Sequence, residues 1–249
     1  MRTLKLTLSY DGTTYAGWQL QPDRTTVQGV LEAAFEKVTG QPTRVRAASR
    51  TDAGVHALGQ VVGLRTECEL PTEVLRRALN ARLPNDVAVL DVAEVPKGFH
   101  ATRDAVRKRY RYVIHDGPVR DVLLRRYCWQ YFRGRLDEQA MHRAAQSLLG
   151  QHDFVSFQSS GAQREGTVRT LFDIGIERGR AGEEDRITLE VEGNGFLYNM
   201  VRAIVGTLVE VGRGVQGENW PAEVVQAADR RRAGPTAPPQ GLLLLWVAY

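Results

Sequence analysis

The sequence predicts an α+β fold, and two observations support this prediction. In the first half of the chain, segments of alternating apolar residues and segments with apolar residues three and four positions apart follow one another as strand, helix, strand, strand, helix, strand. That is the split βαβ, or ferredoxin-like, order, in which two helices cover an antiparallel sheet. The second half reads as a decorated version of the first. We therefore expect two ferredoxin-like halves that form a largely antiparallel sheet flanked by helices.

The first half is expected to hold four strands and two helices. Its first strand, LKLTLSY, ends at the turn signal Asp11-Gly12. Gly40 ends the first helix, and Pro71 stands at the beginning of the second. The expected strands are 4–10, 44–49, 59–67 and 87–95, and the expected helices are 26–40 and 71–83.

The second half is expected to begin near Pro96-Lys97-Gly98, so the predicted domains are residues 1–97 and 98–249. Apolar periodicity predicts its elements as it does in the first half. The expected strands are 108–116, 125–132, 168–179, 185–195 and 242–249, and the expected helices are 137–150, 197–212 and 221–231.

Composition places the chain among globular proteins with a basic balance. The hydrophobic content is 43%, the formal net charge is +4, and four of the 33 basic residues are lysines. Arginine binds phosphate with two donors and stacks on bases, so this balance favours nucleic acid as a partner, although a GC-rich genome or a thermophilic host would also enrich arginine. The two cysteines form no disulfide framework, and no signal peptide or membrane span is indicated. We expect a cytoplasmic protein.

Arginines also cluster along the chain, most densely in RKRYR (107–111). Tyr110 and Tyr112 interleave with these basic residues. Basic and aromatic residues that alternate along one strand are typical of a surface that contacts RNA. A solvated, charged edge strand is the alternative interpretation.

Arg202 is the one charged residue between Glu192 and Glu210. Its predicted helix is mostly buried, and a cation near a helix N-terminus opposes the helix dipole. A charge in that position requires a partner, because burying an unpaired charge is costly. An acidic residue elsewhere in the chain is therefore expected beside Arg202, either in a structural ion pair or in an active site.

Asp52 lies in the stretch ASRTDAGVHALGQ (48–60), in a glycine-containing bend between two predicted strands. We expect its carboxylate to project from a sheet edge into a central active-site cleft, where Ala53 and Gly54 let another molecule approach the backbone. The alternative is an Asx-type turn aspartate that bonds only the local backbone.

Few rival catalytic sets are present. The five histidines show no metal-binding spacing, and no cofactor motif occurs, so neither a metal nor a cofactor is expected. LTLSYDGT superficially resembles an aspartyl-phosphate motif, but Ser9 stands where the nucleophilic aspartate would be, and a phosphotransferase that used Asp11 would need a metal site.

The motif RTDAGVHA (50–57) resembles the catalytic motif of the tRNA pseudouridine synthase A family. Five further segments resemble the remaining signatures of that family, in the same order. They are YDGTTYAGWQLQ (10–21), GFHATRDAVRKRYRY (98–112), HDFVSF with VRTL (152–171), GNGFLYNMVRAIVGTLVEVGRG (193–214) and APPQGLLLLWVAY (237–249). The family usually has glycine where this chain has Ser49.

The resemblance implies an isomerase that converts uridine to pseudouridine in the anticodon stem-loop of tRNA. It implies a homodimer without metal or cofactor, and a target base that leaves the RNA stack. A non-catalytic RNA-binding protein is the alternative function.

The resemblance also assigns roles to individual residues. Asp52 is the nucleophile, which attacks either the ribose carbon or C6 of the base. Arg202 keeps the Asp52 carboxylate charged, and Tyr110 stacks on the target uracil. Arg50 occupies or stabilises the space that the base vacates, or else contacts a phosphate. His56 shapes the loop or contacts RNA, and other arginines hold the tRNA by its phosphates.

Overall fold

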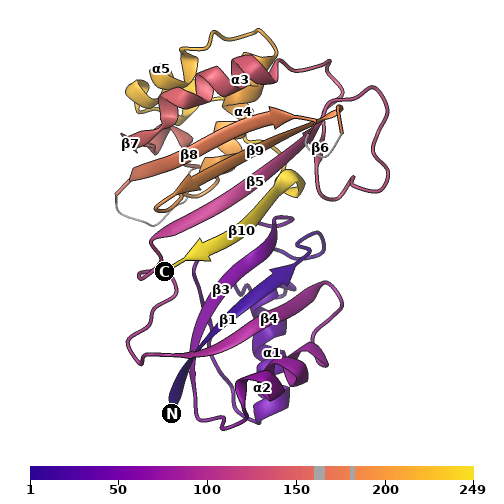
Figure 1. Cartoon of the computed structure of the whole chain (residues 1–249), viewed down its shortest axis with the longest axis vertical. Coiled ribbons are helices and arrows are strands. Elements are labelled where there is room, and N and C mark those ends of the chain that lie inside the picture. The colour runs from indigo at the N-terminus through magenta and orange to yellow at the C-terminus, as the bar shows by residue number, and fades with distance from the viewer. Residues whose placement is uncertain (160–165, 180–182) are drawn as a thin grey trace. The chain divides into compact units, whose positions relative to one another are not determined.

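The computed structural model describes residues 1–159, 166–179 and 183–249, which form two compact units (Figure 1). The first unit comprises residues 1–106 together with 243–249, and the second comprises residues 107–242. Ten strands and five α-helices occur in this part of the chain, and most strand pairs are antiparallel. The predicted α+β class with a largely antiparallel arrangement is thereby confirmed. None of the helices described is long and apolar enough to cross a membrane.

The first unit has the element order that the sequence predicted. Its strands pair antiparallel in the order β4–β1–β3–β2, and the last strand of the chain, β10, runs parallel to β3. The helices α1 and α2 pack on each other, and α2 packs on β4. The bounds are β1 (Arg2–Tyr10), α1 (Val27–Thr39), β2 (Arg46–Ala47), β3 (His56–Thr66), α2 (Thr72–Asn80), β4 (Val87–Val95) and β10 (Leu242–Ala248).

Local chemistry explains why β1 and α1 form where they were predicted. Alternate residues of β1, from Leu4 to Tyr10, are buried, as expected for a strand with one face on the core. The Thr26 side chain caps α1 by accepting a hydrogen bond from the Gly29 N–H, and Gly40 ends the helix with a left-handed φ of 72°.

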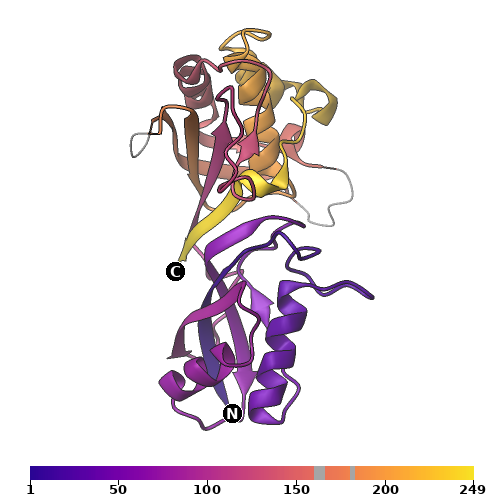
Figure 2. The same cartoon turned by 90° about the vertical axis from the view of Figure 1, so that its right-hand side faces the viewer.

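The second unit has the antiparallel strand order β5–β9–β8–β7, with the short β6 parallel to β5 (Figure 1). Figure 2 gives the view turned by 90°. Its bounds are β5 (Arg107–His115), β6 (Trp129–Gln130), α3 (Glu138–Ala145), β7 (Gly150–Asp153), β8 (Val168–Arg178), β9 (Arg186–Gly193), α4 (Met200–Gly212) and α5 (Trp220–Ala227). Single 3-10 turns lie at Gln146–Leu148, Val155–Phe157, Arg230–Arg232 and Pro239–Gly241.

Several predicted elements are shorter than the sequence indicated, among them the helix expected over 137–150, which is α3 (Glu138–Ala145). At three others, polar side chains bond the backbone at the ends. The strand expected over 44–49 is reduced to β2, since the Gln60 side chain bonds the backbone of Ser49. Asn80 bonds both backbone groups of Val89 at 2.8 Å, and α2 ends there. The strand expected over 125–132 is reduced to β6, because Asp121 accepts from two successive N–H groups and starts a turn.

Candidate active site

Asp52 lies in the bend that connects β2 to β3 of the first unit, where it is half-buried. The residue before it, Thr51, is 7% exposed, and the residue after it, Ala53, is exposed. The Asp52 carbonyl accepts a hydrogen bond from the Val55 N–H at 3.1 Å, which closes the bend. Gly54 has a φ of 78° within this turn, a left-handed conformation that favours glycine.

The N-terminal segment of the chain itself packs against the backbone of this bend. A Cβ on Gly17 would lie 2.8 Å from the Thr51 carbonyl oxygen, and one on Gly12 would lie 2.0 Å from that of Val55. The Trp18 N–H donates to the Thr51 carbonyl at 2.9 Å. The sequence suggested that small residues leave this backbone open to another molecule, but on this side the chain's own glycines make the close approach.

A second set of contacts reaches the bend from β1 and β3. The Tyr10 hydroxyl and Thr51 Oγ1 lie 2.8 Å apart, and the Gln60 amide donates to the Tyr10 hydroxyl at 3.3 Å. The same amide donates to the Ser49 carbonyl at 2.7 Å. Burial raises the pKa of Tyr10 to about 12, although its bonds to Thr51 and Gln60 oppose the rise. The hydroxyl therefore stays protonated at neutral pH.

His56 and Arg50 flank the bend in different environments. His56 is 3% exposed, and its Nδ1 lies 3.0 Å from the Gly12 nitrogen and 3.1 Å from an Asp11 carboxylate oxygen. Nδ1 accepts from the Gly12 N–H in one tautomer and donates to Asp11 in the other, so the ring holds this turn against β3 in either case. This geometry supports the loop-shaping role of His56. Arg50 is exposed and stands two positions before Asp52.

Tyr110 lies on β5 in the second unit and is 5% exposed. Its ring meets that of Phe196 edge to face, with centroids 5.1 Å apart and an interplanar angle of 83°. Phe196 comes from the loop that joins β9 to α4. The phenol ring is therefore already held by an aromatic neighbour.

Arg202 lies in the first turn of α4, as the sequence predicted. Its Nε donates to the Ala237 carbonyl at 2.7 Å, and a terminal nitrogen donates to Asn199 Oδ1 at 2.7 Å. Burial raises the pKa of Tyr112 well above its usual value, and the positive charge of Arg202 opposes the rise. Arg202 thus belongs to a polar cluster that joins α4, β5 and the segment before β10.

The predicted site residues are divided between the two units. Arg50 and Asp52 share one bend of the first unit, whereas Tyr110 and Arg202 belong to the second. The pairing of Arg202 with Asp52 and the stacking of Tyr110 on uracil stay predictions.

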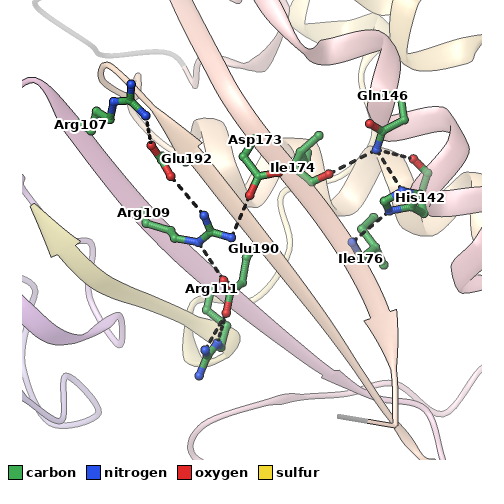
Figure 3. Close-up of polar contacts among 10 residues, drawn as sticks. All are labelled: Arg107, Arg109, Arg111, His142, Gln146, Asp173, Ile174, Ile176, Glu190 and Glu192. Atoms are coloured by element: carbon green, nitrogen blue, oxygen red, sulfur yellow. Dashed lines mark hydrogen bonds and ion pairs between the residues drawn. The ribbon is translucent and has the colours of Figure 1, made fainter.

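The arginines of RKRYR do not form an open basic surface. The alternation places them on one face of β5 and Tyr110 and Tyr112 on the buried other face. Each of the three arginines pairs with carboxylates of β9, and Arg109 also pairs with one of β8 (Figure 3). The pairs are Arg107–Glu192 at 2.9 Å, Arg109–Glu190 at 2.8 Å, Arg109–Glu192 at 3.1 Å, Arg109–Asp173 at 2.8 Å and Arg111–Glu190 at 2.6 Å. We call this set the β5 ladder, and its three positive charges face three negative ones.

Comparison with known proteins decides the family. The family model described as "tRNA pseudouridine synthase" matches residues 7–103 and 144–249. The tRNA pseudouridine synthases A of Thermoanaerobacter sp. (strain X514) and Brevibacillus brevis are 45% and 46% identical, and the match covers the whole of this chain and of each relative. That of Myxococcus xanthus is 46% identical over all of this chain and 92% of the relative. The chain belongs to the tRNA pseudouridine synthase family.

Family membership gives the N-terminal signature YDGTTYAGWQLQ a physical meaning. From the sequence alone, neither this motif nor Gln60 has a predicted role at the Asp52 bend. In the structure Tyr10, Gly12 and Gly17 of this motif contact the Asp52 bend. Tyr10 sits beside Trp18 of the same motif, with ring centroids 6.1 Å apart. Residues of this motif therefore hold the bend that carries the predicted nucleophile of a pseudouridine synthase.

Proposed function

We propose that Asp52 is the nucleophile with which this chain isomerises uridine to pseudouridine in the anticodon arm of tRNA. The activity follows from the full-length likeness: the chain is a tRNA pseudouridine synthase A, an isomerase. The observation that carries the role of Asp52 is the position of this half-buried residue on a bend whose backbone is fixed from both sides.

The reaction needs few groups from the protein. The bond from N1 of uracil to the ribose C1′ breaks, the base turns, C5 joins C1′, the proton on C5 leaves, and N1 of the product carries a proton. An ionised carboxylate can hold the intermediate covalently, by attack on C1′ or on C6, and it leaves again when the new bond is complete.

The second half, residues 98–249, would supply the groups that face the base in the predicted central cleft, opposite the nucleophile of the first half, residues 1–97. Arg202 would keep the Asp52 carboxylate charged, since a guanidinium beside a carboxylate favours the ionised form. Tyr110 would lay its ring on the uracil. Arg50 would occupy or stabilise the gap that the target base leaves in the RNA stack, and its exposed position permits this contact.

The assembly and location expected from the sequence are also proposals. Two copies would form a homodimer in the cytoplasm. The segment after β5 exposes three apolar side chains close together in sequence, Val119 at 74%, Val122 at 59% and Leu123 at 85%. Clustered exposed apolar residues are typical of an interaction site. A monomeric mass by light scattering under assay conditions would contradict the dimer.

The Asp52→Asn variant tests the nucleophile. A carboxamide has nearly the same shape but is a poor nucleophile, so we expect the bend and most tRNA affinity to persist. We expect the rate of pseudouridine formation to fall at least ~10³-fold. The measurement is single-turnover conversion with enzyme in excess over tRNA, read by mass spectrometry after a chemical label for pseudouridine.

The matched control is Asp91→Asn, which changes an exposed aspartate of β4 in the same unit and should convert tRNA as the parent does. If Asp52→Asn stays within about tenfold of the parent, or ~1.4 kcal/mol of barrier, Asp52 is a turn residue and not the nucleophile.

A further inference from the structure

Gln60 holds the backbone immediately before the Asp52 bend with its side chain. The residue is 0% exposed, and its amide Oε1 accepts from the Ser49 N–H at 3.3 Å while Nε2 donates to the Ser49 carbonyl at 2.7 Å. β2 has ended at Ala47, and the Ala48 N–H still bonds the Val61 carbonyl at 2.7 Å. The Gln60 amide thus replaces a strand partner at the point where the chain turns toward Asp52.

Tyr10 extends this anchor to the residue next to Asp52. Its hydroxyl accepts from Gln60 Nε2 at 3.3 Å and lies 2.8 Å from Thr51 Oγ1. Tyr10 is 4% exposed and Thr51 is 7% exposed, so water competes little for these bonds. A buried polar network fixes its members more firmly than exposed hydrogen bonds do, because each unmade bond costs free energy.

The remaining backbone bonds leave the bend little freedom. The Thr51 carbonyl accepts from the Trp18 N–H at 2.9 Å, and the Asp52 carbonyl accepts from the Val55 N–H at 3.1 Å. The backbone on both sides of Asp52 is therefore fixed, and the residue itself is half-buried. For a nucleophile such precision matters, since a misplacement of about 1 Å can cost ~10²-fold in rate.

We propose that Tyr10 and Gln60 are positioning residues, which set the direction of the Asp52 carboxylate through Thr51 and Ser49. The inference rests on the proposed role of Asp52 as nucleophile. If the network served stability alone, removing one of its hydrogen bonds would destabilise the fold, but bound tRNA would react at the parent rate. A positioning network would lose rate in the bound complex.

The test compares two buried tyrosines of the same unit. Tyr10→Phe removes the hydroxyl that bonds Thr51, whereas Tyr15→Phe removes one that donates to Asp86 at 2.5 Å. We expect Tyr10→Phe to slow single-turnover conversion at saturating enzyme by about tenfold or more. The conversion rate of Tyr15→Phe should stay within about twofold of the parent, and so should the tRNA Kd of both variants. A Tyr10→Phe rate within about twofold of the parent, or equal slowing in both variants, would overturn the inference.

Changes at Thr51 decide the question if Tyr10→Phe does not fold. Thr51→Ser keeps the hydroxyl and should retain the rate, whereas Thr51→Val keeps the shape without it and should lose about tenfold or more. Equal rates in these two variants would overturn the inference. Its failure is separable from that of the proposed function: an inactive Asp52→Asn beside a fully active Tyr10→Phe removes only the positioning role, whereas an active Asp52→Asn removes the nucleophile itself.

Discussion

Gly12 shows how a single residue constrains the bend that carries Asp52. A Cβ at this position would lie 2.0 Å from the Val55 carbonyl oxygen, and the Gly12 N–H lies 3.0 Å from His56 Nδ1. Backbone atoms cannot move aside as a flexible side chain can. The residue is therefore required by a close approach of two backbones and not by its own conformation, since its φ is not left-handed.

We expect Gly12→Ala to destabilise the protein by about 1–3 kcal/mol, as overpacking of a fixed site does. Its matched control is Gly98→Ala in the same unit, where an added Cβ would meet no atom within 4 Å. That control should stay within about 0.5 kcal/mol of the parent in the free energy of unfolding. Denaturant unfolding measures both, and equal stability of the two variants would show that the bend relaxes around the methyl group.

Secondary-structure elements differ in how far the sequence predicted them. β1 and α1 were predicted closely because alternation, the Thr26 cap and Gly40 are all local signals. β2 and β6 were overpredicted, because the side chains of Gln60 and Asp121 compete for backbone groups.

The β5 ladder could not be predicted at all. Its arginines and carboxylates lie about eighty residues apart in sequence, as in Arg109–Glu190, and only the pairing of β5 with β9 brings them together. The candidate site also combines a bend that the sequence predicted with contacts that it did not. No local pattern predicts which buried groups hold the Asp52 bend, because the hydrogen bonds between Tyr10, Thr51 and Gln60 depend on strand register.

A buried ion pair joins three elements of the second unit. The side chain of Asp116, just after β5, is 0% exposed, and it accepts two bonds of 2.8 Å from Arg178 at the end of β8. It also accepts from the Leu136 N–H, just before α3, at 2.9 Å. Burial alone would raise the pKa of Asp116, but the bonds from Arg178 and Leu136 together lower it below its usual value.

The lowered pKa of Asp116 predicts acid sensitivity. Because the folded pKa lies below that of the unfolded chain, about 3.9, the stabilisation is complete above the unfolded value and is lost as pH falls through the folded one. Asp116→Asn should lose about 3 kcal/mol at neutral pH and flatten the dependence of stability on pH below about 4.

The control for Asp116 is Asp185→Asn in the same unit. Asp185 pairs with Arg135 at 3.1 Å, but the two side chains are 47% and 53% exposed. An exposed pair contributes about 0–1 kcal/mol, so this variant should lose stability with falling pH as the parent does. Urea unfolding across the acid range measures the free energy of unfolding of both variants. If Asp116→Asn loses stability with falling pH as the parent does, the acid sensitivity comes from other carboxylates.

Across the whole molecule, a net charge of +4 does not reveal which arginines hold tRNA. The structure sorts some of them. Arg109 faces Glu190, Glu192 and Asp173 within 3.1 Å and is 22% exposed, so its charge is already matched. Arg50 is exposed beside the predicted nucleophile. Phosphate binding should therefore depend on arginines outside the β5 ladder.

Salt dependence tests this division. Binding of tRNA should weaken steeply between about 50 and 200 mM salt, because each neutralised phosphate releases counterions. Arg109→Met should lower the free energy of unfolding, since it deprives three carboxylates of a partner, yet leave the slope of log Kd against log salt unchanged. An arginine that contacts phosphate would change that slope by about 0.7–0.9 when removed. A change of that size in Arg109→Met would mean that the β5 ladder opens to bind RNA. An affinity of the parent protein that does not respond to salt would show that phosphate contacts do not contribute to tRNA binding.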